Sequence, residues 1–376
     1  MTIPGGLMAF LAAAALLGPP EAAGQAVAPG GAARQIIDTQ CTGCHALSLV
    51  TEKRASRGEW EEILGRMSDN GASLAPDDTP AVLDYLAANF GPAAAGAAPA
   101  GGASDRYEVD TDWARLPEGM TWDASTTSIA ADGRGQVVVL VRTAPYFRVF
   151  TRDGEFVRAW GDAALFGEAH SVMFDRDGNL WATDSNGHVV YKFSPDGALL
   201  MTLGTRGVAG DNVSRDLFNR PNAVAIAVNG DIYVSDGYVN SRIVHFTSGG
   251  EFVRIIGGTA GSEPGQLQLP HGVVVDSRGR VIVGDSDNGR VSVFDAGGGF
   301  VEIWPVPSRG GMLITSDDTV YVSDVAANAI HVIREGVLVE TIGGLGRVHN
   351  ITLDSDGVIY AADSLNRTVM KVTPRD

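Results

Sequence analysis

The chain is poor in cysteine, in positive charge and in long hydrophobic runs. Its 376 residues include two cysteines, so a small fold stapled by many disulfides is excluded. Lys and Arg number 28 against 45 Asp and Glu, for a formal net charge of −17. Nucleic-acid and anionic-membrane binding both need a basic footprint, so we expect neither. The prominent apolar run, residues 7–17, is shorter than the roughly 20 residues of a membrane-spanning helix.

That run is typical of the apolar core of a secretory signal. It reads LMAFLAAAALL and is followed by the small residues of PPEAAGQA. We therefore expect residues 1–26 to be a signal peptide. The protein would then be periplasmic or otherwise exported, with no membrane span after cleavage.

Residues 32–92 have a helical pattern. The stretch RGEWEEILGRMSDNG spaces its apolar residues as an amphipathic helix does. DDTPAVLDYLAANFGP begins with Asp and Thr as expected caps, places Pro80 near the first turn and ends at Gly-Pro. Residues 93–104 are rich in Ala, Gly and Pro and predict a linker.

Residues 105–376 predict a β-propeller. Short β-branched runs alternate with turn residues, as in RDGNLWATDS, NGDIYVSDG and SDGVIYAADS. An aspartate ends the second strand of successive units, and these landmark aspartates are Asp184, Asp236, Asp285, Asp324 and Asp363. With an earlier unit the pattern makes six units of about four strands, an all-β six-bladed propeller. The last unit lacks its fourth strand, which we expect residues 106–113 to supply.

The CTGCH stretch allows four interpretations. A disulfide between Cys41 and Cys44 would close a very short loop. A redox dithiol would need a thioredoxin-like βαβ context, which the sequence does not show. A zinc knuckle would need more ligands nearby, but residues 46–169 contain neither Cys nor His. Covalent haem c fits best, with Cys41 and Cys44 forming thioethers and His45 under the iron.

Met67 is the methionine between His45 and the linker, so we predict it as the second axial ligand, with a role in electron transfer. Its alternative role is an ordinary core side chain. The segment resembles compact class I-type cytochrome c domains over about 60 residues, through CTGCH, Met67 and the ending YLAANFGP. An electron-transfer haem implies a redox partner protein.

Histidine recurs in alternate repeats. His170, His271 and His349 each lie 14 residues before a landmark aspartate, in the second, fourth and sixth units. Equivalent side chains from alternate blades converge on the propeller axis, and three converging imidazoles with an open position form a catalytic-type Zn²⁺ site. A lone histidine there would more often be structural. The other propeller histidines occupy other repeat positions, and we interpret these as structural: His188, His245 and His331.

Two further side chains are expected on the same face. Arg142 takes the landmark position in the first unit, and Tyr238 follows Asp236 in the loop after the second strand. Loops at this end lie on the face where the innermost strands start. Arg142 and Tyr238 are therefore expected to point toward the histidines, unless Arg142 pairs between blades and Tyr238 packs in its loop.

Residues 118–376 resemble the peptidyl-α-hydroxyglycine α-amidating lyase propellers, built of NHL-type repeats. The strings SDGY, NSRIV and PGQLQLPH carry the resemblance. It implies zinc on His170, His271 and His349, a catalytic Tyr238 and an active-site Arg142. The reaction implied cleaves a carbinolamide to an amide and an aldehyde. Streptogramin-lyase propellers share the architecture, but the three-histidine set matches the amidating lyases better.

The resemblance also implies a structural Ca²⁺ ion. Its ligands would be the carbonyls of Ile129 and Val172 and the side chain at position 350, which is an asparagine here. An amide oxygen can bind Ca²⁺ but brings no charge.

Three functions therefore stay open from sequence. The first is a lyase acting on a small-molecule or peptide-like substrate. The second is an oxidoreductase whose propeller oxidises a small molecule and passes electrons to the haem, for which copper would suit the three-histidine site. The third is a non-catalytic binding propeller.

Overall fold

The computed structural model describes residues 33, 36–37, 55, 57–69, 74–75, 78–90, 106–122 and 124–375. The signal peptide expected at 1–26, the CTGCH stretch and the linker expected at 93–104 lie outside these residues. In the described part, no helix is both long and apolar enough to cross a membrane.

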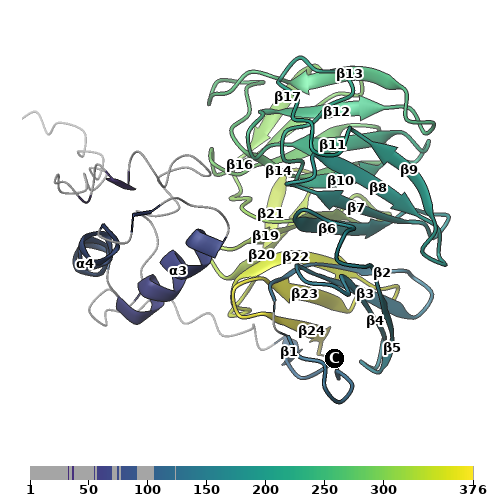
Figure 1. Ribbon diagram of the computed structural model, residues 1–376. Helices are drawn as coiled ribbons and strands as arrows, with labels where there is room; N and C mark the ends of the chain where they lie inside the picture. Colours follow the sequence, from purple (N-terminus) through teal and green to yellow (C-terminus); the bar gives the residue numbers. More distant parts are fainter. Residues whose placement is uncertain are drawn as a thin grey trace, which may run out of the picture.

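Residues 106–375 form the predicted propeller, in which six four-stranded antiparallel sheets are arranged around a central axis (Figure 1). Blade 1 consists of β2 (Thr126–Ala131), β3 (Gln136–Val141), β4 (Phe147–Thr151) and β5 (Phe156–Trp160). Blade 2 consists of β6 (Ala169–Phe174), β7 (Leu180–Asp184), β8 (Val189–Phe193) and β9 (Leu199–Leu203). Blade 3 consists of β10 (Ala223–Ile226), β11 (Ile232–Asp236), β12 (Arg242–Phe246) and β13 (Phe252–Gly257).

Blade 4 consists of β14 (Pro270–Val275), β15 (Val281–Asp285), β16 (Arg290–Phe294) and β17 (Phe300–Trp304). Blade 5 consists of β18 (Met312–Ile314), β19 (Val320–Asp324), β20 (Ala329–Arg334) and β21 (Val337–Gly343). Blade 6 combines β22 (Val348–Leu353), β23 (Ile359–Asp363) and β24 (Thr368–Pro374) with β1 (Tyr107–Asp110). β1 pairs antiparallel with β24, so the N-terminal strand closes the ring as the sequence predicts.

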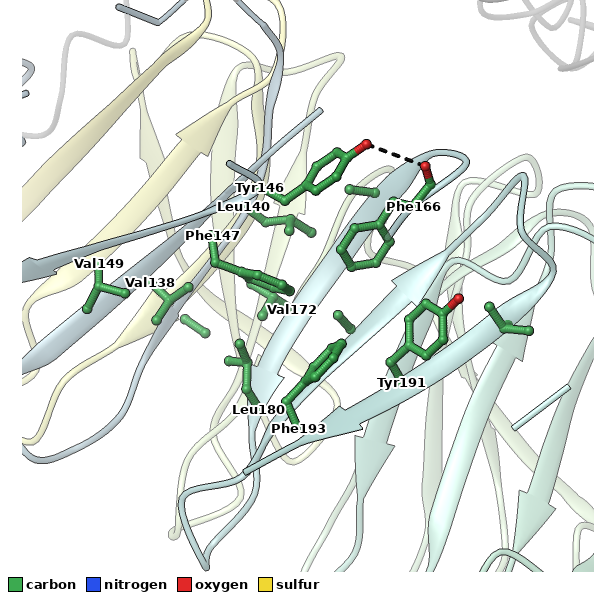
Figure 2. Packing of buried hydrophobic residues seen from close by; sticks show 14 residues of the cluster. Val138, Leu140, Tyr146, Phe147, Val149, Phe166, Val172, Leu180, Tyr191 and Phe193 are labelled. Atoms are coloured by element: carbon green, nitrogen blue, oxygen red, sulfur yellow. Dashed lines mark hydrogen bonds between the residues drawn. The ribbon is translucent and has the colours of Figure 1, made fainter. Parts of the chain in front are cut away.

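The core consists of layers between neighbouring blades. Between blades 1 and 2, Phe147 meets Phe193 edge-on at a centroid distance of 5.7 Å (Figure 2). Phe147 also stacks on Trp160 at 4.0 Å. The Tyr146 hydroxyl donates to the Phe166 carbonyl at 3.4 Å. The apolar runs of the inner strands are buried against the next blade because each blade has neighbours on both faces, so the ring is held by side-chain packing.

The landmark aspartates hold the loops that precede the innermost strands. Asp184 is fully buried, and its carboxylate accepts backbone N–H groups from Gly167, Glu168 and Gly187, each at 2.8 Å. Asp236 and Asp285 accept the N–H groups of Asn219 and Gln268 in the same way. In these three blades the aspartate therefore sets where the innermost strand begins, whereas Asp324 of blade 5 accepts N–H groups of the loop that follows it.

Two of the predicted helices are present: α3 (Arg57–Asp69) and α4 (Thr79–Asn89). They pack with Ile37 and Ala55 around Trp60, whose indole N–H donates to the Phe90 carbonyl at 3.1 Å. The predicted proline lies in the first turn of α4, but the predicted aspartate cap is wrong. Asp78 has helical backbone angles and its side chain makes no capping hydrogen bond; an N-cap that accepts the free N–H groups needs a non-helical backbone there.

Candidate functional site: three histidines on the propeller axis

A β-bulge presents each of the three axial histidines. In blade 2, Ala169 pairs with Asp184 and Ser171 pairs with Thr183, so His170 is the extra residue between them. The same shift leaves His271 unpaired in blade 4 and His349 unpaired in blade 6. A bulge residue is free of the ladder and its side chain is re-aimed. The repeat therefore turns the same side chain toward the axis three times.

The three imidazoles meet as the sequence predicts. Their ring centroids are 5.0, 5.0 and 5.1 Å apart. One nitrogen from each ring lies within 4.8 Å of the others. His170 and His271 are buried and His349 is half-buried. The spacing suits three nitrogen ligands on one ion, with room for a further ligand.

The Nδ1 atoms face the backbone of the next blade. His170 Nδ1 donates to the Asn222 carbonyl at 2.7 Å, and His349 Nδ1 donates to the Thr127 carbonyl at 2.6 Å. His271 Nδ1 has no partner of good geometry, although the Gly310 backbone is close enough to raise its pKa. Protons on Nδ1 leave Nε2 of His170 and of His349 with a lone pair, as a metal ligand requires.

The histidines are held neutral. Burial lowers the pKa of His271 to about 4. Burial and the charge of His271 lower the pKa of His349 to about 3, and burial lowers the pKa of His170 well below its usual value. All three imidazoles are therefore free to coordinate at neutral pH, so the donor set fits a divalent transition metal.

Tyr238 lies against this cluster as the sequence predicts. Its hydroxyl is 2.7 Å from His170 Nε2, and its ring meets the His170 ring edge-on. Burial raises the pKa of Tyr238 to about 12, and the positive charge of Arg142 opposes that rise. Tyr238 is thus the group nearest to a ligand nitrogen that can carry a proton.

The loop that carries Tyr238 can only be built with glycine at position 237. A Cβ atom at Gly237 would lie 1.9 Å from the Pro270 carbonyl oxygen of blade 4. The Gly237 N–H donates to the Asn222 side-chain oxygen at 2.8 Å. This close approach ties the Tyr238 loop to the start of β14, immediately before His271.

Arg142 is near the site, but its predicted repeat position is wrong by one residue. Val141 lies opposite Thr126, the place that Asp184 takes opposite Ala169. Position in the repeat is set by ladder hydrogen bonds, and blade 1 has no aspartate to mark it. The Arg142 charge nevertheless lowers the pKa values of His170 and His349. Its guanidinium also pairs between blades, with Glu168 at 3.0 Å.

Two charged residues of the site escaped the sequence analysis. Glu168 precedes His170 by two residues, and Arg220 precedes Asn222 by two residues. Arg220 pairs with Glu168 at 3.0 Å, and its guanidinium carbon is 5.0 Å from the Tyr238 ring centroid. Their shared repeat position, two residues before the axial one, is the signal that could have found them.

The calcium ligands implied by the resemblance line one cavity. Ile129, Val172 and Asn350 lie in the wall of an axial cavity of about 790 Å³. The Val172 carbonyl accepts the Ser128 hydroxyl at 3.5 Å, and the Val172 N–H donates to the same Ser128 Oγ at 3.0 Å. The Asn350 amide packs against Gly311. The residues therefore surround a common space, and Ca²⁺ stays a prediction.

The other propeller histidines have local partners. His188 Nδ1 accepts the Arg220 backbone N–H at 3.1 Å. His245 stacks on Tyr233 and contacts the Asp231 carboxylate at 3.0 Å. His331 Nδ1 lies 3.0 Å from the Thr341 hydroxyl. These contacts agree with structural roles.

Most of the predicted haem residues lie outside the part of the chain that the structure describes. Cys41, Cys44 and His45 lie outside the described residues. Met67 is described: it is half-buried on α3, seven residues after Trp60, and does not belong to the cluster around Trp60. Residues seven apart share a helix face, so Met67 lies on the same face of α3 as Trp60.

Comparison with protein families and curated proteins identifies the repeat. The NHL repeat model matches residues 218–246 and 267–294. Human NHL repeat-containing protein 3 is 30% identical over 298 residues, which cover 71% of this chain and 84% of that protein.

Amidating enzymes are also similar over the propeller. Peptidyl-glycine alpha-amidating monooxygenase B of Xenopus laevis is 30% identical over 234 residues, 56% of this chain and 26% of that protein. A probable peptidyl-alpha-hydroxyglycine alpha-amidating lyase of Caenorhabditis elegans is 34% identical over 152 residues, 40% of this chain and 43% of the relative. The chain therefore spans less than half the length of these two relatives.

Solved structures support the fold alone. A streptogramin B lyase superposes with a TM-score of 0.52 at 13% identity, covering 72% of this chain and 98% of its own. A gluconolactonase of Xanthomonas campestris superposes with a TM-score of 0.56 at 14% identity, covering 74% of this chain and 93% of its own. Identities this low establish the propeller architecture and no activity.

Proposed function

The chain belongs to the NHL repeat-containing β-propeller proteins and is homologous to the amidating lyases, and on this premise we propose that its propeller is a metal-dependent carbon–nitrogen lyase. The substrate would be an N-acyl-α-hydroxyglycine, as a small molecule or at the end of a peptide. The observation that carries the proposal is the convergence of His170, His271 and His349 beside the Tyr238 hydroxyl.

The metal would be held by His170, His271 and His349. Zn²⁺ suits three neutral nitrogen ligands with an open position, and when bound it supplies a Lewis acid for the substrate hydroxyl. Ca²⁺ is proposed for the axial cavity, on the carbonyls of Ile129 and Val172 and the Asn350 amide oxygen.

Tyr238 would move the proton. As phenolate it takes the proton from the substrate hydroxyl; the O–H electrons form the C=O bond of the aldehyde as the C–N bond breaks, and Tyr238 returns the proton to the amide nitrogen. No oxidant or water is consumed. Burial raises the pKa of Tyr238 to about 12, so the phenolate needs positive charge nearby, which Arg142 partly provides.

For the N-terminal part we propose a cytochrome c domain over residues 32–92, behind a signal peptide at 1–26 and before a linker at 93–104. Haem c would be attached to Cys41 and Cys44, with His45 and Met67 as axial ligands. The protein would be exported and would exchange electrons with a redox partner.

The same CTGCH pattern favours a second candidate, a periplasmic oxidoreductase in which the propeller oxidises a small molecule and reduces the haem. Carbinolamide cleavage transfers no electrons, so the haem would have a direct role only in this second reaction. Copper in the three-histidine site would serve it, because zinc is redox-inert.

One preparation tests both candidates. The purified full-length protein is analysed for metal, incubated with N-benzoyl-α-hydroxyglycine and assayed for glyoxylate and for haem reduction. Stoichiometric zinc and glyoxylate release support the lyase. Copper with haem reduction supports the oxidoreductase. The absence of both reactions leaves a binding propeller.

A further inference from the structure

Three consecutive blades contribute one charged cluster beside the histidines: Arg142 from blade 1, Glu168 from blade 2 and Arg220 from blade 3. One Glu168 carboxylate oxygen lies 3.0 Å from an Arg142 guanidinium nitrogen in an ion pair, and the other accepts a hydrogen bond from Arg220 at 3.0 Å. A single carboxylate therefore holds two guanidinium groups that come from opposite sides of it.

The cluster has an unbalanced charge. Two arginines pair with one glutamate. The side chains of Arg142, Arg220 and Glu168 are only 24%, 23% and 12% exposed. Placing an unpaired charge away from water is unfavourable unless another group balances it. This local positive excess stands in a chain whose net charge is −17, so it is not part of a generally basic surface.

The cluster also has unused hydrogen-bond donors. The Nε atoms of Arg142 and Arg220 are both buried and have no hydrogen-bond partner in the described structure. A buried donor without a partner is destabilising, because it has lost its hydrogen bonds to water. An additional oxygen acceptor would meet both needs, since a carboxylate brings negative charge and fits the planar guanidinium fork.

The cluster faces the reacting groups. The Arg220 guanidinium carbon lies 5.0 Å from the Tyr238 ring centroid, and the Tyr238 hydroxyl lies 2.7 Å from His170 Nε2. A carboxylate held by these arginines would therefore lie beside the Tyr238 ring, whose hydroxyl contacts His170.

The left-handed backbone of Arg220 does not carry the argument. Its φ is 62°, but Leu269, at the same repeat position in blade 4, has a φ of 53°. The left-handed conformation is therefore not peculiar to the arginine of blade 3.

We infer that Arg142 and Arg220 form a clamp, a pair of guanidinium groups that binds the carboxylate of the substrate. Glu168 holds the two guanidinium groups in place and competes with the substrate carboxylate for them. The inference rests on the proposed function, because it names the substrate group bound at the same site. Arg220 and Glu168 are positioning residues: they set which acids enter and how they lie against Tyr238.

The test measures binding of two unreactive probes to the purified full-length protein by calorimetry. N-Acetylglycine carries the carboxylate, and N-acetylglycinamide is its neutral counterpart. We expect the parent to prefer the acid. Arg220→Gln should weaken binding of the acid about tenfold and leave the amide unchanged, because a charge-assisted hydrogen bond is lost. Glu168→Gln should tighten binding of the acid several-fold, because the competing carboxylate is gone.

The matched control is Arg115→Gln, which removes an exposed arginine paired with Glu155 and should bind both probes as the parent does. Metal content and the thermal midpoint report folding. If Arg220→Gln does not fold, Arg220→Lys, which keeps the charge but not the fork, should bind the acid with intermediate affinity.

The inference is overturned if the parent does not prefer the acid, if Arg220→Gln or its lysine substitute binds the acid like the parent, or if Glu168→Gln weakens binding. Glyoxylate release is measured separately. Should the probes follow the expected pattern without any turnover, the clamp stands and the lyase proposal falls.

Discussion

The even-numbered blades and the odd-numbered blades share one strand frame but contribute different groups to the axis. Blades 2, 4 and 6 present imidazoles through their bulges. Blades 1 and 3 accept the Nδ1 protons of His349 and His170 on the carbonyls of Thr127 and Asn222. The odd blades also provide Arg142, Arg220 and Tyr238. A repeat can thus divide a site: the even blades supply the three imidazoles and Glu168, and the odd blades accept the Nδ1 protons of two imidazoles and supply the two arginines and the tyrosine.

Removing an even-blade ligand should have the largest effect. His271→Ala leaves two imidazoles, so we expect metal affinity to fall by more than about 100-fold and turnover with it. Metal analysis and glyoxylate release measure this. His331→Gln, a propeller histidine outside the cluster, should keep both, and the spectrum of the proposed haem should be unchanged in each. Stoichiometric metal in His271→Ala would contradict the three-histidine site.

Removing the odd-blade acid–base group should separate chemistry from metal binding. Tyr238→Phe loses only the hydroxyl, so we expect turnover to fall about 10²–10⁴-fold while metal content stays at the parent level. Tyr233→Phe, in the same blade and stacked on His245, is the control. Equal turnover in Tyr238→Phe and the parent would exclude Tyr238 as the base.

Disturbing the contact between an odd blade and an even blade should cost stability. In Gly237→Ala the new Cβ would collide with the Pro270 carbonyl, which we expect to lower the free energy of unfolding by about 1–3 kcal/mol. The thermal midpoint should fall by several degrees. Gly249→Ala has its nearest atom at 3.7 Å and should be close to neutral; similar midpoints in the two variants would show that the Tyr238 loop is not held this way.

The smallest effect expected is a pH slope in the metal-free protein. The folded pKa values of His271 and His349, about 4 and about 3, lie below the unfolded value near 6.5. The unfolded chain therefore binds more protons between pH 6.5 and pH 4, so stability is complete above pH 6.5 and is lost as the pH falls. Each histidine contributes at most about 1.4 kcal/mol per pH unit.

Urea unfolding at several pH values measures this slope. In His349→Asn the free energy of unfolding should depend less steeply on pH, by the equivalent of one bound proton. His331→Gln should leave this slope unchanged. A slope that His349→Asn does not alter would mean that His349 is not held neutral in the folded protein.

Much of the propeller was predictable from the sequence. The landmark aspartates repeat because most of them accept backbone N–H groups of the loop before an innermost strand, and a periodic sequence stacks into a periodic fold. The offset of 14 residues found all three axial histidines because each stands in the same bulge. The closure by β1 was also predictable, since the last repeat is short of one strand.

Register and charge pairing were not predictable. The place of Arg142 depends on which residues share a ladder hydrogen bond, and blade 1 lacks the aspartate that marks it elsewhere. Glu168 and Arg220 are 52 residues apart in sequence; their shared repeat position could have marked both residues, but not the pairing of their charges. The missing cap at Asp78 likewise depends on backbone angles that composition does not specify.

The sequence by itself determined the six-bladed repeat, the alternation of histidine around it and the CTGCH pattern, because strand periodicity and residue spacing are local properties that recur. Only the tertiary structure decided that the Tyr238 hydroxyl meets His170 Nε2 and that Glu168 holds Arg142 and Arg220 together. Those contacts join separate blades, and their geometry follows from how the blades pack around the axis.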